Sequence, residues 1–169
     1  EAKAKAEAEA QKMKDLKDKF MNSQELKNLL SSTSNIGGPT LYNAWNKLGP
    51  LSVETIIENS DSLILGINSE DIEFKEVVSG NLKYTGFHKK GTNTQHGICR
   101  MVYFNNYILE GMYVNGSLNG FGRRVYEDGT HYVGMWKGGR RNGKGKVVNA
   151  DGTVSQEGEF ENHYLKVKK

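Results

Sequence analysis

Residues 132–152 decide the fold, and they read Tyr-Val-Gly-Met-Trp-Lys-Gly-Gly-Arg-Arg-Asn-Gly-Lys-Gly-Lys-Val-Val-Asn-Ala-Asp-Gly. The aromatic side chains of Tyr132 and Trp136 fall on one face of a strand, because side chains alternate between the two faces. Gly134 between them has no side chain, so a neighbouring backbone or ring can approach closely. The pair Asp151-Gly152 favours a tight turn. The stretch therefore predicts a short antiparallel hairpin.

The same pattern recurs through the second half of the chain at a nearly constant spacing. Its copies begin at residues 84, 109, 132 and 156. A fixed period of this size is typical of an array of small supersecondary units. The aromatic and glycine residues that define the copies are Tyr84, Gly86, Gly111, Tyr113, Gly120, Gly122, Tyr132, Gly134, Trp136, Gly143, Gly145, Gly158 and Phe160.

The first and last copies depart from the pattern. In the first copy, Cys99 occupies a glycine position. The fourth copy breaks off after Phe160, and His163 stands where a glycine is expected. We expect Tyr164, Leu165 and Val167 to find no partner strand in the chain. Since an uncovered edge strand invites pairing with another chain, the sequence predicts that another protein covers this edge.

The pattern resembles the MORN repeat, and residues 132–136 and 142–145 match it nearly residue for residue. The resemblance covers about residues 84–161, whereas residues 1–71 carry no motif that we assign. MORN family members form rows of antiparallel hairpins. The resemblance therefore implies a mainly β fold, a curved single sheet of hairpin repeats with an N-terminal helical extension and a small helical cap. The family occurs in cytoskeletal, axonemal and membrane-junction proteins and beside catalytic domains, which implies a binding role.

The chain is predicted to have three zones: a charged helical extension at 1–31, a linker with short helices at 32–71, and the β-hairpin repeat domain at 72–169. The first zone is built from strong helix formers. Its apolar face begins at Met13 and can pack either on the protein's own domain or on a partner protein. Asn22 followed by Glu25 resembles a capping box that starts a second helix.

The second zone is predicted in more detail from its turn residues. Residues 31–40 form a linker, and Thr40 is expected to cap a helix that ends at Gly49. Ser52 is expected to cap the next helix, and residues 63–65 to form a short buried strand. Residues 72–78 alternate between apolar and charged side chains, and the turn at 79–81 makes them the first strand of a degenerate hairpin.

Features that suggest an enzyme are better explained by the repeat. Residues 138–145 look like a phosphate-binding loop, but Gly145 stands where a Ser or Thr must hold Mg²⁺. Cys99 lies near His96 without a third orienting group. The four histidines lack metal-ligand spacing. We therefore expect no catalytic residue, no metal and no cofactor, and we predict that the protein is not an enzyme.

The densest basic cluster comprises Lys137, Arg140, Arg141, Lys144 and Lys146. Such residues on hairpin turns either form a solvated surface or bind an anionic partner, which can be an acidic protein surface or a lipid headgroup. Nucleic acid is disfavoured, because the sequence has neither a recognition helix nor a known RNA-binding motif. The net charge is only +3, but residues 84–169 carry the basic excess.

The sequence predicts a non-enzymatic scaffold or accessory subunit of a larger protein assembly. The alternative is a membrane-targeting module that binds anionic lipid headgroups through basic turns; a regulatory piece of an enzyme would need a catalytic domain outside these residues. A single cysteine allows no internal disulfide and fits a reducing compartment. An intracellular location is expected, cytoplasmic or cytoskeletal and axonemal, with a mitochondrial location after removal of a targeting segment as the alternative.

Overall fold

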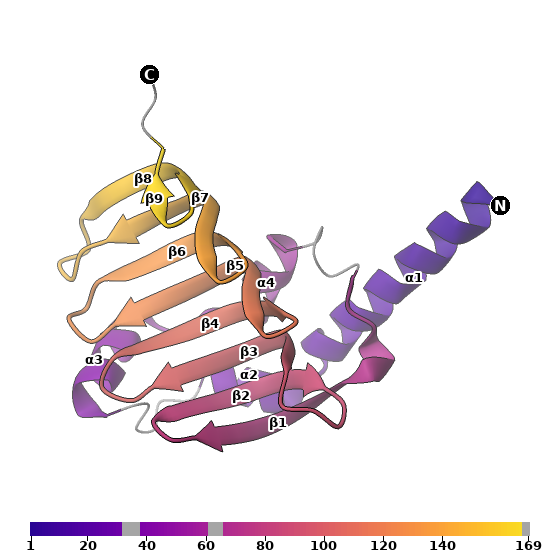
Figure 1. Ribbon diagram of the computed structural model, residues 1–169, viewed down its shortest axis with the longest axis horizontal. Helices are drawn as coiled ribbons and strands as arrows, with labels where there is room; N and C mark the ends of the chain where they lie inside the picture. The colour runs from indigo at the N-terminus through magenta and orange to yellow at the C-terminus, as the bar shows by residue number, and fades with distance from the viewer. Residues whose placement is uncertain (32–37, 61–65, 167–169) are drawn as a thin grey trace.

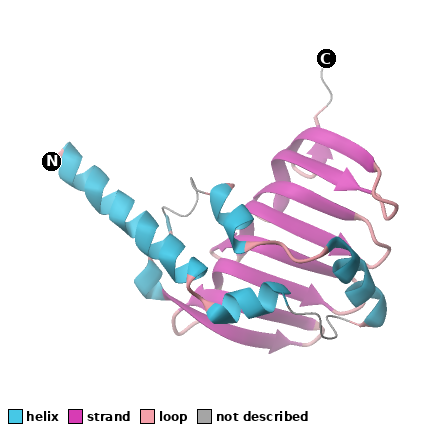
Figure 2. Cartoon of the chain, turned by 180° about the vertical axis from the view of Figure 1, so that it is seen from behind, coloured by secondary structure: helices cyan, strands magenta, loops and turns pink. Residues whose placement is uncertain are grey.

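The computed structural model describes residues 1–31, 38–60 and 66–166. In these residues one open, nine-stranded antiparallel sheet carries helices on one of its faces (Figure 1, Figure 2). The strands lie in the sheet in the order of the sequence, so each strand pairs with its neighbours along the chain. The predicted fold, a mainly β array of antiparallel hairpins with N-terminal helices, is confirmed.

The strands arise from the repeats and from the hairpin before them. Their bounds are β1 (Ile72–Ser79), β2 (Leu82–Lys89), β3 (Gln95–Tyr103), β4 (Tyr107–Val114), β5 (Ser117–Tyr126), β6 (His131–Lys137), β7 (Arg140–Val148), β8 (Val154–Glu161) and β9 (Tyr164–Leu165). The predicted degenerate hairpin is β1 and β2, and Gly80 closes its turn with φ of 58°. Glycine adopts this left-handed conformation at little cost.

The C-terminal edge differs from the expectation. Tyr164 and Leu165 form β9 and pair with the end of β8, so they do find a partner strand in the chain. Asn162 and His163 make this possible because both adopt positive φ, 48° and 79°, and so close a tight turn without glycine. Phe160 is consequently buried within the chain. Strand β9 pairs with only the last two residues of β8, Phe160 and Glu161, and Tyr164 remains 77% exposed. Val167 lies outside the described residues.

The helices are α1 (Ala2–Met21), α2 (Gln24–Ser31), α3 (Pro39–Leu48) and α4 (Val53–Glu58), followed by the short 3₁₀ helix η2 (Ser69–Asp71). Leu16 and Phe20 of α1 are fully buried and share a core with Ile98 and Met112 of the sheet. The apolar face of the first zone therefore packs on the protein's own domain. Residues 1–12 of α1 are exposed and project away from the sheet (Figure 1).

Two predicted helix starts are wrong by one or two residues. The hydroxyl of Ser23, not the side chain of Asn22, accepts a hydrogen bond from the backbone N–H of Leu26 at 3.1 Å. Helix α3 begins at Pro39, so Thr40 lies inside it. The fixed φ of proline suits the first turn of a helix, where no N–H is needed for the helical ladder.

Other predicted boundaries are confirmed. Gly49 ends α3 with φ of 81°, and its N–H bonds to the Trp45 carbonyl. The Ser52 hydroxyl caps α4 by accepting a hydrogen bond from the Thr55 N–H at 3.1 Å. The predicted strand at 63–65 and most of the predicted linker, residues 32–37, lie outside the described residues.

One residue on each of seven neighbouring strands faces its counterpart on the next strand directly, and six of these seven residues are glycines without a side chain. They are Gly86, Cys99, Gly111, Gly122, Gly134, Gly145 and Gly158, which we call the glycine row. A Cβ atom on Gly86 would lie 2.5 Å from the Cα atom of Cys99. A Cβ atom on Gly145 would collide with the Tyr132 ring, which lies over this glycine. The missing side chains thus leave room for close backbone contacts and, at Gly145, for the Tyr132 ring.

A buried charge cluster fastens the helices to the sheet. The fully buried carboxylate of Glu110 accepts hydrogen bonds from Arg100 Nε at 2.9 Å, Arg123 Nη2 at 3.0 Å and Trp45 Nε1 at 3.0 Å. Arg123 also donates to the carbonyl of Gly49 at the end of α3. Burial alone would raise the pKa of Glu110, but the two guanidinium groups and the indole hold it below its usual value. We call these four side chains the Glu110 cluster.

We predict that Gly134→Val destabilises the protein by about 1–3 kcal/mol, because the new side chain would overfill a closed backbone contact. Its Cβ would collide with the Gly145 Cα atom, and the φ of 153° is unfavourable for valine. Urea denaturation measures the loss. Gly66→Val is the matched control, since its Cβ would meet nothing within 4 Å. Equal stability of Gly134→Val and wild type would contradict the packing role of the glycine row.

We predict that Glu110→Gln lowers the free energy of unfolding by about 3–5 kcal/mol, since two buried guanidinium groups would lose their counter-ion. The difference from wild type should shrink as the pH falls below about 4. The carboxylate stabilises the fold above its unfolded pKa of about 4.3, and this contribution disappears as the pH drops through the lower folded value. Urea midpoints of both proteins between about pH 7 and pH 3 test this. A constant difference at all pH values would argue against a carboxylate held ionised by the arginines.

Candidate binding surface

The helices cover only one of the two faces of the sheet. Figure 1 looks onto the uncovered face, and Figure 2 shows the helices lying across the opposite one. Helix α3 packs on Val102, Ile108 and Val125, and this face is here called the helix-side face. The other face, which carries the glycine row and the side chains of Tyr132 and Trp136, is called the helix-free face. A partner can therefore reach the helix-free face without displacing a helix.

Aromatic side chains form a second core on the helix-free face. The Tyr132 ring meets the Trp136 and Phe160 rings edge to face, each at 5.1 Å between ring centroids. All three residues are buried, as is Tyr113 of the preceding copy. Tyr132 and Phe160 belong to successive repeats, so an aromatic ring of one repeat packs on that of the next. Because Gly134 and Gly145 of the glycine row lie beneath the Tyr132 ring, this ring packs close to the backbone.

A row of tyrosines extends the same face beyond this core. Tyr103, Tyr107 and Tyr126 are direct cross-strand partners on β3, β4 and β5. Their ring centroids are separated by 5.5 Å and 6.3 Å. All three are half-buried, so part of each ring remains open to solvent. Partly exposed tyrosines are enriched at protein interfaces, where they provide contact area with little entropic cost.

The structure does not bring the five predicted basic residues together. Lys137 and Arg140 are exposed partners beside the turn between β6 and β7. Arg141 is half-buried on the helix-free face, where its guanidinium lies 5.0 Å from the Tyr132 ring. Lys144 and Lys146 instead line a groove of about 810 Å³ beside α4 on the helix-side face. Their strand neighbours across β8 are Glu159 and Glu157.

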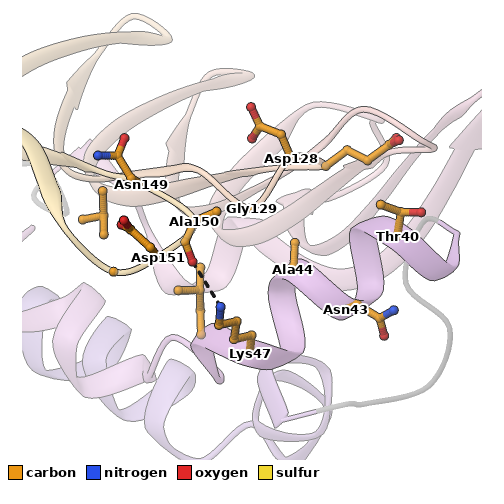
Figure 3. Close-up of a pocket in the computed structure, with 13 residues that line it drawn as sticks. Thr40, Asn43, Ala44, Lys47, Asp128, Gly129, Asn149, Ala150 and Asp151 are labelled. Carbon is orange, nitrogen blue, oxygen red and sulfur yellow. Dashed lines mark hydrogen bonds between the residues drawn. The ribbon is translucent and has the colours of Figure 1, made fainter.

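A second hollow, of about 480 Å³, lies between α3 and two repeat turns (Figure 3). Lys47 of α3 donates to the carbonyl of Ala150 at 3.1 Å. The two aspartates here are engaged in their own turns. Asp128 accepts hydrogen bonds from the hydroxyl and N–H of Thr130, which lower its pKa, and Asp151 does the same with Thr153. The hollow thus lies where helix α3 packs against two Asp-Gly-Thr turns, at 128–130 and 151–153.

The residues that resemble a phosphate-binding loop or a nucleophile pair in the sequence occupy turn and packing positions in the fold. Gly138 and Gly139 close a hairpin turn with positive φ, and strand β7 follows where a phosphate-binding loop would need a helix. Cys99 is fully buried in the glycine row, and burial raises the pKa of its thiol. His96 Nδ1 accepts a hydrogen bond from the backbone of Asn115 at 3.1 Å. No group of three metal-binding side chains occurs among the described residues.

Arg124 is a residue of this surface that the sequence analysis did not single out. Its guanidinium lies 3.9 Å from the centre of the Tyr107 ring and 5.0 Å from that of Tyr126. The neighbouring Arg123 points to the opposite face and belongs to the Glu110 cluster. Adjacent residues of a strand face opposite ways, so alternation along β5 from Gly122 could have placed Arg124 on the face of the glycine row and Arg123 on the other.

The repeats are recognised by comparison with known families. The family model of the MORN repeat matches residues 110–131 and 132–154, which run from β4 to the beginning of β8. The comparison with curated proteins gives no match to the sequence. The two matched segments coincide with the second and third copies of the pattern, the copies that carry Tyr113 and Trp136. Residues 110–131 and 132–154 of this protein are therefore MORN repeats.

Proposed function

We propose that the protein is a non-enzymatic scaffold or accessory subunit of a larger protein assembly. MORN repeats are generally modules that interact with proteins or membranes. The observation that carries the proposal is the helix-free face, which the described helices leave uncovered over its whole width (Figure 1). The tyrosine row of Tyr103, Tyr107 and Tyr126 offers aromatic surface there, as the centres of protein interfaces do.

The exposed half of α1 supports a second attachment. The side chains of residues 1–12 are all exposed, although helix α1 continues through residues 2–12. Isolated polar helices of this length are marginal in water, because most helical stability in proteins comes from tertiary packing. A partner helix lying beside residues 1–12 would supply that packing.

The alternative is a membrane-targeting module that binds anionic lipid headgroups. A flat bilayer can contact only one face of a sheet at a time. Arg141 lies on the helix-free face whereas Lys144 and Lys146 lie on the helix-side face, so these cations cannot all reach one bilayer. Among the described residues, no helix is both long and apolar enough to cross a bilayer. The distribution of the basic residues favours a protein partner. Separately, we propose an intracellular site of action, cytoplasmic or cytoskeletal.

We predict that a photo-crosslinking amino acid at Tyr103, on the helix-free face, captures one protein of defined mass when the protein is expressed in its own cells. The same group at Lys144, on the helix-side face, is the matched control and should give less of that adduct. Mass spectrometry of the adducts identifies the captured species. Lipid adducts at both positions, or equal capture of many proteins by both, would contradict a scaffold that binds through the helix-free face.

A further inference from the structure

We propose that the helix-free face carries a binding site for an acidic peptide segment of a partner protein, built from Arg124 and Arg141 held between three tyrosines. The inference rests on the proposed function and narrows it to one surface and one partner chemistry. Carboxylate side chains of the peptide would supply the counter-ions that both guanidinium groups lack.

The two arginines and three tyrosines alternate across the sheet. Arg124 stacks on Tyr107 at 3.9 Å and lies 5.0 Å from Tyr126. Arg141 Nη2 donates a hydrogen bond to the Tyr126 hydroxyl at 3.1 Å, and its guanidinium lies 5.0 Å from the Tyr132 ring. Strands β4 to β7 supply these five residues. Stacking fixes each guanidinium in place, so little further ordering is needed when a carboxylate binds.

Neither arginine has a counter-ion within the described part of the chain. Arg100 and Arg123 are the arginines that form ion pairs there, both with Glu110, and no carboxylate of the described residues lies within 4.0 Å of Arg124 or Arg141. The Nε atoms of both are shielded from solvent and have no hydrogen-bond partner among the described residues. Desolvated charges are normally paired, and an uncompensated guanidinium strongly favours an incoming anion.

The positive field extends to the last turn of the array. Burial lowers the pKa of His163, and Arg141, Arg124 and Arg140 lower it further. The backbone N–H of His163 donates to the Arg141 carbonyl at 3.0 Å, which ties this turn to the arginine-bearing strand. His163 also holds the strained φ of 79°. The turn at His163 therefore adjoins the strand that carries Arg141.

The placement of these cations favours a peptide over a bilayer. Both arginines are half-buried among aromatic rings, whereas the cations that project from the turn are Lys137 and Arg140. Both guanidinium groups lie against Tyr126, since Arg124 is 5.0 Å from its ring centroid and Arg141 donates to its hydroxyl at 3.1 Å, so they gather around one ring. An extended or helical peptide can set two carboxylates beside this ring and enter between the tyrosines. Planar, bidentate recognition of carboxylate is the chemistry to which arginine is suited.

The test measures binding of a fluorescein-labelled decaglutamate peptide to the full chain by fluorescence anisotropy. We expect Arg124→Met with Arg141→Met to weaken binding at least tenfold, since both charge-assisted contacts are removed. Lys144→Met with Lys146→Met is the matched control, because it removes the same charge from the opposite face; it should change the affinity less than twofold. Arg124→Lys with Arg141→Lys keeps the charge but loses the planar fork, and should fall between the two. Circular dichroism and thermal melting identify any variant that does not fold.

Three outcomes would overturn the inference. Equal weakening by the arginine and lysine pairs would mean that only net charge matters, and absence of decaglutamate binding would mean that there is no such site. Binding to vesicles of phosphatidylserine and phosphatidylcholine that depends on the two arginines, without peptide binding, would assign the cations to a membrane. The proposed function is tested separately by the photo-crosslink at Tyr103. If a protein is captured there and its binding is unchanged in the Arg124→Met, Arg141→Met variant, the scaffold function stands and this peptide site is rejected.

Discussion

The close approach of backbone to backbone along the glycine row is the constraint on which the rest of the structure depends. Gly134 and Gly145 face each other directly, and the Tyr132 ring occupies the space that a side chain on Gly145 would fill. With larger residues in the row, the aromatic core on the helix-free face would be lifted from the sheet. Cys99 is the largest residue of the row, and it is fully buried. The repeat pattern of glycines and aromatics is thus a packing requirement that is met once in each strand.

The glycine row also explains why the two faces of the sheet differ. Rings that lie over glycines cover the backbone on the helix-free face, so that face forms a core without help from a helix. The helix-side face has ordinary side chains and needs covering, which α1 to α4 provide. The Glu110 cluster fixes α3 in this layer through three strands and the end of the helix. The helix-side face is therefore stabilised by packed helices, whereas the helix-free face has an aromatic core of its own and remains accessible.

The hairpin array could be predicted because its determinants are local. Period-two alternation, turn glycines and the spacing of copies specify β3 to β8 without knowledge of the rest of the chain. The last strand was missed because Asn162 and His163 adopt a conformation usually left to glycine. The arginine–tyrosine arrangement was missed for a different reason. Arg124, Tyr107 and Arg141 lie on three strands, and only the register of those strands decides that they lie beside one another on that face.

The order of the strands in the sheet has a consequence for how such a protein can change in length. Every strand pairs only with the strands next to it in sequence, so contacts between distant parts of the sheet are not needed to complete it. A whole unit can be inserted or deleted between two others while the remaining units keep their neighbours. Stability then grows by nearest-neighbour increments, and folding can begin in any unit and spread outward. The length of the helix-free face across the strands is therefore set by the number of repeat units.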